Sequence, residues 1–239
     1  MMSISFDPAL QILWQDEWLL AVNKPSGLLA IQDGYQTELP HVRQLLEPQF
    51  GRLYILHRLD RETSGIMLLA RTPETHKHLS LQFEKHAVRK TYLAIVPGQP
   101  DWQEGTVDLP LRSSTGRRKR TTVDFKRGKP AKTSLEVISA AKDYSLIQAS
   151  PHTGRTHQIR AHLYASGFPI LGDSLYGDKA NYPPGVASRL ALHALNLSIQ
   201  HPATEDVLAI AAPLHPDFFE MASRCSLTIP NFALRSGKI

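Results

Sequence analysis

Cysteine is almost absent from this chain of 239 residues. The single cysteine, Cys225, excludes an internal disulfide and a zinc site built from paired cysteines. Long apolar runs are also missing, since none approaches the roughly 18 residues that a membrane helix needs. The first residues show no basic segment followed by an apolar one. We therefore expect no secretory signal, no membrane association and a cytoplasmic location.

Several common catalytic motifs are missing as well. The sequence has no glycine-rich phosphate loop before a helix, no Gly-x-Ser-x-Gly and no His-Glu-x-x-His. His152, His157 and His162 repeat every five residues, so a helix would not place them on one face to bind a metal. Nucleotide-cofactor, serine-hydrolase and metal chemistry are therefore unsupported.

Positive charge is modest overall but unevenly distributed. The net charge is +5, and one segment between Arg112 and Lys132 carries nine lysines and arginines against a single acid, Asp124. Such a segment suits a phosphate backbone, where neutralised charges release counterions and supply affinity that is independent of sequence. The alternative is a solvated loop that keeps the protein in solution.

Short apolar runs bounded by turn residues predict many strands and few helices. No regular alternation of strand and helix occurs, which favours an α+β fold with a mostly antiparallel mixed sheet and flanking helices and loops. We expect one domain over residues 1–227 and a C-terminal tail over residues 228–239. The strands are expected at 12–22, 53–56, 66–70, 90–96, 132–139, 144–149, 190–200 and 206–211, and the helices at 73–86, at 157–166 and after Pro216.

The most informative stretch is His-Arg-Leu-Asp-Arg-Glu-Thr-Ser-Gly at residues 57–65, between two apolar runs. Two arginines and a histidine lie within three residues of Asp60. Positive neighbours keep a carboxylate ionised, which suits a nucleophile better than a proton donor. Residues 63–65 are typical of a turn, so we expect Asp60 on a loop at the mouth of a sheet. A solvated ion pair at a strand end is the alternative interpretation.

Two further places carry reactive or basic side chains. Tyr92 lies on an expected strand directly after Arg89 and Lys90. Residues 152–162 bring two arginines, three histidines and a glutamine to the start of an expected helix, where anions are attracted. Each histidine could equally be a hydrogen-bonded packing residue. The residues by themselves indicate an α+β protein that binds RNA or another anion.

Six segments, in order between residues 12 and 213, resemble the RluA family of RNA pseudouridine synthases. His-Arg-Leu-Asp at 57–60 with Thr-Ser-Gly at 63–65 is similar to the family's first motif. Lys-Thr-Tyr-Leu-Ala at 90–94 and Gly-Arg-Thr-His-Gln-Ile-Arg-Ala-His at 154–162 are similar to its second and third motifs. Supporting segments lie at 23–27, 170–177 and 192–194, and the chain is therefore identified as a member of this family.

The resemblance implies that the chain converts uridine to pseudouridine within RNA, on a pseudouridine synthase catalytic fold. Asp60 matches the catalytic aspartate that starts glycosidic cleavage, and whether it attacks ribose or base stays open. Tyr92 matches the tyrosine that stacks on the target base and takes part in removing the proton from carbon 5. Arg160 matches the arginine that pairs with the aspartate, and Arg58 matches a residue that helps to hold the target nucleotide out of the RNA stack. No cofactor or metal is implied.

The same resemblance makes residues 112–130 a loop that grips RNA. The candidate RNA-binding residues, besides Arg58, are Arg117, Arg118, Lys119, Arg120 and Arg155. Larger relatives carry an N-terminal RNA-binding module, for which we expect no room before Asn23, so the chain resembles the compact members. We expect its partner to be a stem-loop of transfer RNA, of large-subunit ribosomal RNA or of both, with no obligatory protein partner and a monomeric state.

Two other functions remain open at this point. A non-catalytic RNA-binding protein or RNA chaperone could use the same fold, although RNA binding alone does not require Asp60, Tyr92 and Arg160. An N-glycosidase could use Asp60 to stabilise an oxocarbenium ion, and it would release free base.

Overall fold

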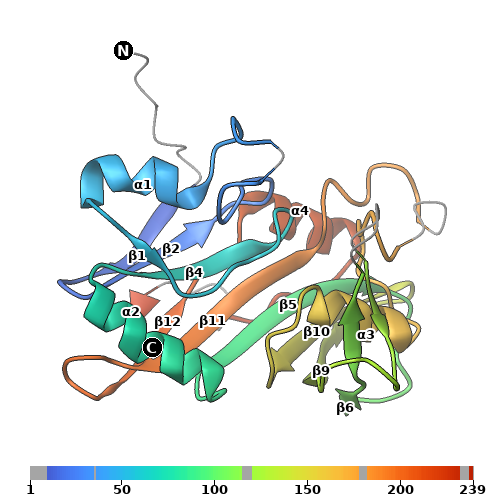
Figure 1. Ribbon diagram of the computed structural model, residues 1–239. Coiled ribbons are helices and arrows are strands. Elements are labelled where there is room, and N and C mark those ends of the chain that lie inside the picture. The colour runs from blue at the N-terminus through green and yellow to red at the C-terminus, as the bar shows by residue number, and fades with distance from the viewer. Residues whose placement is uncertain (1–9, 35, 115–119, 178–181, 232–236, 239) are drawn as a thin grey trace. The chain divides into compact units, whose positions relative to one another are not determined.

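The computed structural model describes residues 10–34, 36–114, 120–177, 182–231 and 237–238 (Figure 1). The chain forms two compact units. Unit 1 comprises Met1–Arg89, Ala194–Pro213 and Arg235–Ile239, and unit 2 comprises Lys90–His193 and Leu214–Leu234. Two of the boundaries between the units fall within strands, one in β5 (Arg89–Pro97) and one in β11 (Leu192–Gln200).

Unit 1 is built on a sheet in which β1, β2, β4 and β11 follow one another. β12 pairs with β11, β13 pairs with β12, and the short β3 pairs with β4. The strands are β1 (Gln11–Gln15), β2 (Leu19–Lys24), β3 (Tyr54–Ile55), β4 (Ser64–Ala70), β11 (Leu192–Gln200), β12 (Val207–Ala211) and β13 (Gly237–Lys238). Two helices, α1 (Val42–Phe50) and α2 (Pro73–Glu84), accompany them.

The core of unit 1 follows from the strand period of two. Every residue of β2 and of β4 is buried, so both strands are covered on both faces. Alternate residues of each strand point to the same face, and there they pack against one side of α1. This cluster includes Leu20, Val22, Met67, Leu69, Val42 and Leu46.

Unit 2 contains an antiparallel run of strands in the order β5, β10, β9, β6, and a separate two-stranded hairpin, β7–β8. These strands are β5 (Arg89–Pro97), β6 (Glu104–Asp108), β7 (Leu111–Ser113), β8 (Thr121–Val123), β9 (Lys132–Ala140) and β10 (Tyr144–Pro151). The helices are α3 (Gln158–Ala165) and α4 (Pro216–Arg224). A small apolar cluster joins α3 to the base of the hairpin through Ala161, Leu111 and Tyr176.

The α+β fold with a mostly antiparallel mixed sheet is confirmed, and most expected elements are present. The start of α2 is the clearest case: Thr72 accepts a hydrogen bond from the Thr75 amide at 3.1 Å, and Pro73 occupies the first helical turn. The expected end of α3 is also confirmed, because Gly167 has φ +86° directly after the helix.

The turn expected at residues 63–65 is wrong. The turn lies at residues 61–62, and Ser64 and Gly65 already belong to β4. Gly65 has φ +112°, and a Cβ there would lie 2.2 Å from the carbonyl oxygen of Ala194. The glycine is therefore required by the close approach of β11 to β4 rather than by a turn.

Five elements of the described part of the chain were not expected: α1, β6, the two strands of the hairpin β7–β8, and β13. Of the tail expected over residues 228–239, the Thr228 amide donates to Ser139 Oγ at 3.2 Å, and β13 pairs with β12. The domain boundary at residue 227 stays a prediction.

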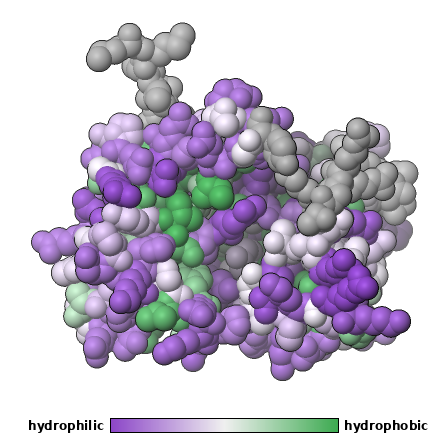
Figure 2. All heavy atoms as spheres, viewed as in Figure 1, coloured by the Kyte–Doolittle hydropathy of each residue, from purple (hydrophilic) through white to green (hydrophobic). Residues whose placement is uncertain are grey.

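The surface in the view of Figure 2 is mostly hydrophilic, with apolar side chains in small areas. Within the described part of the chain, no helix has both the length and the apolar character needed to cross a membrane.

Candidate active site

Asp60 lies in unit 1 on the loop between β3 and β4, as expected, and its side chain is half-buried. The loop turns back at once, because the Thr63 amide donates to the Asp60 carbonyl at 3.1 Å. Leu59 before it and Thr63 after it are buried, so the backbone on each side of the carboxylate is held by packing. Arg58 is exposed on the same loop.

A buried lysine ties this loop to a second one. The Lys24 side chain has 0% exposure, and its ammonium donates to three carbonyl oxygens. Those of Pro25 and Leu28 lie at 2.9 Å, and that of Arg61, next to Asp60, lies at 3.1 Å. Lys24 therefore acts as an internal crosslink between the loop at residues 23–30 and the loop that carries Asp60.

Further hydrogen bonds join the same two loops. The Gly27 amide donates to the Arg61 carbonyl at 2.8 Å, and Arg61 Nε donates to the Gly27 carbonyl at 3.0 Å. Ser26 Oγ donates to the Glu62 carbonyl at 2.7 Å. The Asn-Lys-Pro-Ser-Gly segment is thus a scaffold for the loop of Asp60.

His57 has a structural contact on this loop. Its Nε2 accepts a hydrogen bond from the Leu68 amide at 3.0 Å, and its ring stacks on Phe83 of α2 with centroids 5.0 Å apart. A ring nitrogen that accepts is unprotonated, so the imidazole holds the entry to the loop rather than donating a proton at Nε2.

Tyr92 lies in unit 2 on β5, opposite Ala149 of β10, and is half-buried. Two residues earlier, burial lowers the pKa of Lys90. A Cβ added to Gly154 would lie 3.9 Å from Lys90 Nζ. The second and third family motifs therefore meet within unit 2.

The loop before α3 is organised by Gln158. Its Oε1 accepts from Thr153 Oγ1 at 2.7 Å and from the Arg155 amide at 3.0 Å. Its Nε2 donates to the Lys132 carbonyl and to Thr133 Oγ1, both at 3.0 Å. The first two contacts shape the loop before the helix, and the other two fasten the start of the helix to β9.

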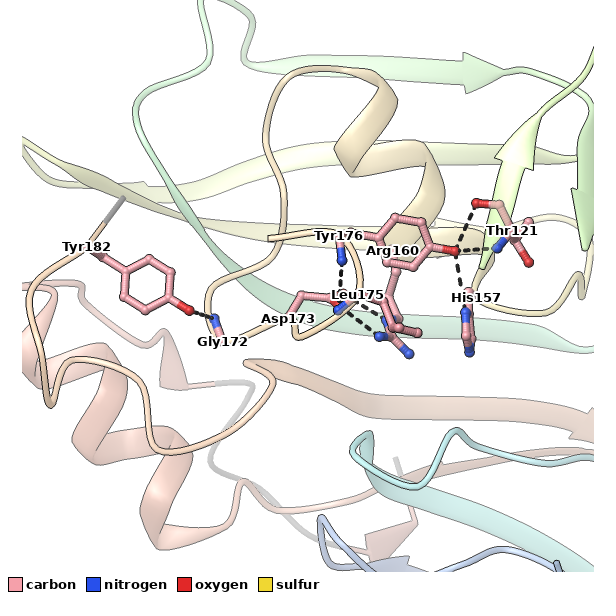
Figure 3. Close-up of polar contacts among 8 residues, drawn as sticks. All are labelled: Thr121, His157, Arg160, Gly172, Asp173, Leu175, Tyr176 and Tyr182. Atoms are coloured by element: carbon pink, nitrogen blue, oxygen red, sulfur yellow. Dashed lines mark hydrogen bonds and ion pairs between the residues drawn. The ribbon is translucent and has the colours of Figure 1, made fainter. Parts of the chain in front are cut away.

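Arg160 is buried on α3 and forms a bidentate ion pair with Asp173 (Figure 3). Its Nε lies 2.7 Å from Asp173 Oδ2, and its Nη2 lies 2.8 Å from Asp173 Oδ1. Asp173 Oδ1 also accepts from the amides of Leu175 and Tyr176 at 2.9 and 3.1 Å. The guanidinium is thus held in one orientation by a carboxylate that is itself fixed by the backbone.

The sequence did not predict Asp173 as a partner of Arg160. The available signal was the acid inside the supporting segment 170–177, because a buried carboxylate requires a cation or several donors. Pairing of Arg160 with Asp60 stays a prediction, since the two residues belong to different units.

Tyr176 connects this ion pair to β8 of the hairpin β7–β8, which we call the basic hairpin (Figure 3). Its hydroxyl accepts from the Thr121 amide at 2.8 Å and donates to the Thr121 carbonyl at 2.9 Å. Its ring lies under the Arg160 guanidinium, with 5.3 Å from Cζ to the ring centroid. Burial raises the pKa of the Tyr176 phenol, so the hydroxyl stays protonated and can donate.

Arg120 has a structural position in addition to its expected role in RNA binding. Its Cζ lies 4.3 Å from the ring centroid of Tyr164 and 4.8 Å from that of Tyr176, so the guanidinium stacks against two aromatic faces. Arg155 Nε donates to the Pro130 carbonyl at 3.0 Å. Both arginines thus fasten the basic segment at its base. Arg117, Arg118 and Lys119 lie outside the described residues.

Comparison with known proteins identifies the family of this chain. Residues 18–165 match the family model described as RNA pseudouridylate synthase. The chain is 38% identical over 208 residues to the dual-specificity RNA pseudouridine synthase RluA of Escherichia coli (strain K12), covering 87% of this chain and 94% of that protein. The RluA of Yersinia pestis is 40% identical over 192 residues, covering 80% and 92%.

A solved structure gives the same result. Human RNA pseudouridylate synthase domain containing 4 superposes with a TM-score of 0.75 at 28% identity, covering 92% of this chain and 95% of that one. The range 18–165 that the family model matches contains all three motifs. The chain therefore belongs to the RluA family of RNA pseudouridine synthases and is an isomerase that modifies RNA.

Proposed function

We propose that this enzyme isomerises specific uridines in stem-loops of transfer RNA, of large-subunit ribosomal RNA or of both. Relatives that cover most of the chain carry the name dual-specificity RNA pseudouridine synthase. Tyr176 fastens the hairpin β7–β8 to the turn that carries Asp173, the partner of Arg160. A basic hairpin anchored next to Arg160 favours a folded RNA as substrate. The RNA would lie along the cations of residues 112–132, and one uridine would leave its stack to reach the reactive groups.

Asp60 carries the first step of this proposal. For each uridine, the bond between ribose carbon 1′ and nitrogen 1 breaks and a bond from carbon 1′ to carbon 5 forms. The hydrogen on carbon 5 leaves as a proton, and nitrogen 1 takes up a proton, so the product is an isomer of the substrate. Asp60 starts the cleavage by attack on ribose or base. The observation that supports this role is that Asp60 is half-buried on a loop whose Arg61 carbonyl accepts a hydrogen bond from the Lys24 ammonium.

Tyr92 and Arg160 have supporting roles. The Tyr92 ring stacks on the uracil, and its phenol takes part in removing the proton from carbon 5. Arg160 presents a fixed positive charge for the carboxylate of Asp60, which favours its ionised form. Asp173 sets the orientation of that guanidinium.

Tritium release tests this proposal. Transfer RNA and large-subunit ribosomal RNA transcripts would carry tritium at carbon 5 of uridine. Wild-type enzyme should release tritium from at least one of them, Asp60→Ala should release none, and Asp101→Ala, which changes an exposed acid, should match the wild type. Absence of release from both RNAs by the wild type would contradict the proposed substrates.

A further inference from the structure

Residues 124–128 form a tightly hydrogen-bonded turn at the end of β8. Asp124 Oδ1 accepts from the amides of Lys126 and Arg127 at 3.0 and 2.9 Å. The Gly128 amide donates to the Asp124 carbonyl at 2.7 Å. Asp124 Oδ2 pairs with Arg112 at 3.2 Å. One side chain thus fixes the whole turn.

The turn is also hydrogen-bonded to the start of β7. The Asp124 amide donates to the Pro110 carbonyl at 3.0 Å, and Leu111 and Lys129 exchange backbone hydrogen bonds of 2.8 and 2.9 Å. A Cβ on Gly128 would lie 2.4 Å from the Asp124 carbonyl oxygen and 2.8 Å from the Pro110 carbonyl carbon, so only glycine fits. The turn is a defined structure rather than a loose loop.

This turn holds Phe125 in solvent. Its exposure of 76% is higher than that of any other large apolar side chain in the described part of the chain. A single exposed apolar side chain is ordinary in itself. Here, however, the turn places the exposed Lys126 and Arg127 directly after the ring, and exposed Lys129 follows the turn. Exposed Arg112 of β7 pairs with Asp124 of the turn.

Cations around a flat apolar face select a particular kind of ligand. A single-stranded nucleic acid offers a planar base at each nucleotide and a negative phosphate between bases, and aromatic side chains among basic residues bind it by stacking. Phe has no hydrogen-bonding group, so the contact would tolerate any base. An acidic protein with an apolar side chain is a different class of partner, for which stacking on a flat face is unnecessary.

We propose that Phe125 is a stacking platform for an unpaired base of the substrate RNA, with the cations of the same turn on the adjacent phosphates. The proposal rests on the proposed function, because it takes the substrate to be an RNA with unpaired loop nucleotides. It adds a base contact to a hairpin for which composition predicts only phosphate contacts.

Equilibrium binding of a transfer RNA stem-loop tests the platform. Phe125→Ala should weaken binding about tenfold, as expected for one lost base stack. Phe125→Leu keeps an apolar side chain without the flat face and should weaken binding nearly as much. Phe125→Trp keeps a flat aromatic face and should bind RNA with the affinity of the wild type. The matched control is Val207→Ala, which shortens another apolar side chain, 72% exposed and in unit 1, and should leave affinity unchanged.

Salt dependence separates stacking from phosphate contacts. Phe125→Ala should lower affinity at every salt concentration without changing the slope of log K against log salt, whereas Arg127→Gln should reduce that slope by about one. In Phe125→Trp, tryptophan emission should change on addition of RNA relative to the wild type, which already contains Trp14, Trp18 and Trp102.

Two results would overturn the platform: an affinity of Phe125→Ala within twofold of the wild type, or a Phe125→Leu variant that binds RNA as well as the wild type. The second would indicate a merely apolar contact, as for a protein partner. Thermal unfolding shows that the variants fold, since the ring is exposed and its removal should not shift Tm. Failure of the proposed function would instead be seen as absent tritium release by the wild type.

Discussion

Replacement of Lys24 by methionine tests the internal crosslink below Asp60. Methionine has a similar length and is apolar, so it fills the buried space but donates nothing. The Arg61 carbonyl would still accept from the Gly27 amide at 2.8 Å, whereas the carbonyls of Pro25 and Leu28 would lose the donor that the structure gives them. The change should therefore destabilise unit 1 and loosen the loop of Asp60.

The size of the effect follows from these contacts. A buried acceptor that loses its donor costs about 1–3 kcal/mol, so two such carbonyls cost about 2–6 kcal/mol. Part of this cost is offset because the variant no longer buries a charged ammonium. We expect a net loss of about 3 kcal/mol in the free energy of unfolding. For a chain of this size, that loss lowers Tm by about 9 °C.

Thermal unfolding and tritium release measure the two consequences separately. In Lys24→Met, kcat should fall more than tenfold at a temperature where the variant is folded, and KM for RNA should change little, because Lys24 acts through the loop of Asp60. The control is Lys85→Met, which changes an exposed lysine after α2 and should leave Tm and kcat unchanged. A Lys24→Met variant with the Tm and kcat of the wild type would refute the crosslink.

Three other changes test separate parts of the structure. Tyr176→Phe removes both side-chain hydrogen bonds to Thr121 and should raise KM for RNA more than it lowers kcat in steady-state assays; an unchanged KM would contradict the link between hairpin and site. Burial by itself raises the pKa of the Asp16 carboxyl, but the hydrogen bonds that the carboxylate accepts lower it by a larger amount, so the pKa in the folded protein is below the usual value. The carboxylate therefore stabilises the fold above about pH 4 and loses this effect as pH falls, so Asp16→Asn should cost about 1 kcal/mol at pH 7 and little at pH 3 in urea titrations; an equal cost at both would refute this. Burial raises the pKa of the Cys225 thiol to about 11, so an aromatic disulfide reagent at pH 8 should label it only after unfolding, and rapid labelling of the native protein would contradict its burial.

Elements with a strong local signal could be predicted from the sequence. The capping threonine and the proline mark the start of α2, and the continuous apolar run of β4 predicts a buried strand. By contrast, α1 contains Pro48 inside the helix, and proline disfavours a helix interior, so the local sequence does not indicate this helix. The strand β6 is exposed at four of its five positions, so it has no apolar alternation to reveal it.

The candidate site divides in the same way. Local motifs located Asp60 on a loop and Arg160 on a helix, because those positions depend on neighbours in the chain. The crosslink by Lys24 and the ion pair with Asp173 depend on contacts that the fold creates. The sequence around Lys24 does not indicate which groups its ammonium contacts, and in the structure these groups are backbone carbonyls. Gly65 was assigned to a turn for the same reason: the strand that requires it is distant in sequence.

Nucleoside analysis of the product RNA tests the central claim most directly. Wild-type enzyme and Asp60→Ala would each be incubated with the RNA that releases tritium, and the digested RNA would be separated by chromatography. Isomerisation by Asp60 predicts that the wild type forms one pseudouridine for each uridine lost, without free uracil, and that Asp60→Ala forms none. Free uracil with abasic sites in the RNA, or equal pseudouridine from both proteins, would contradict it.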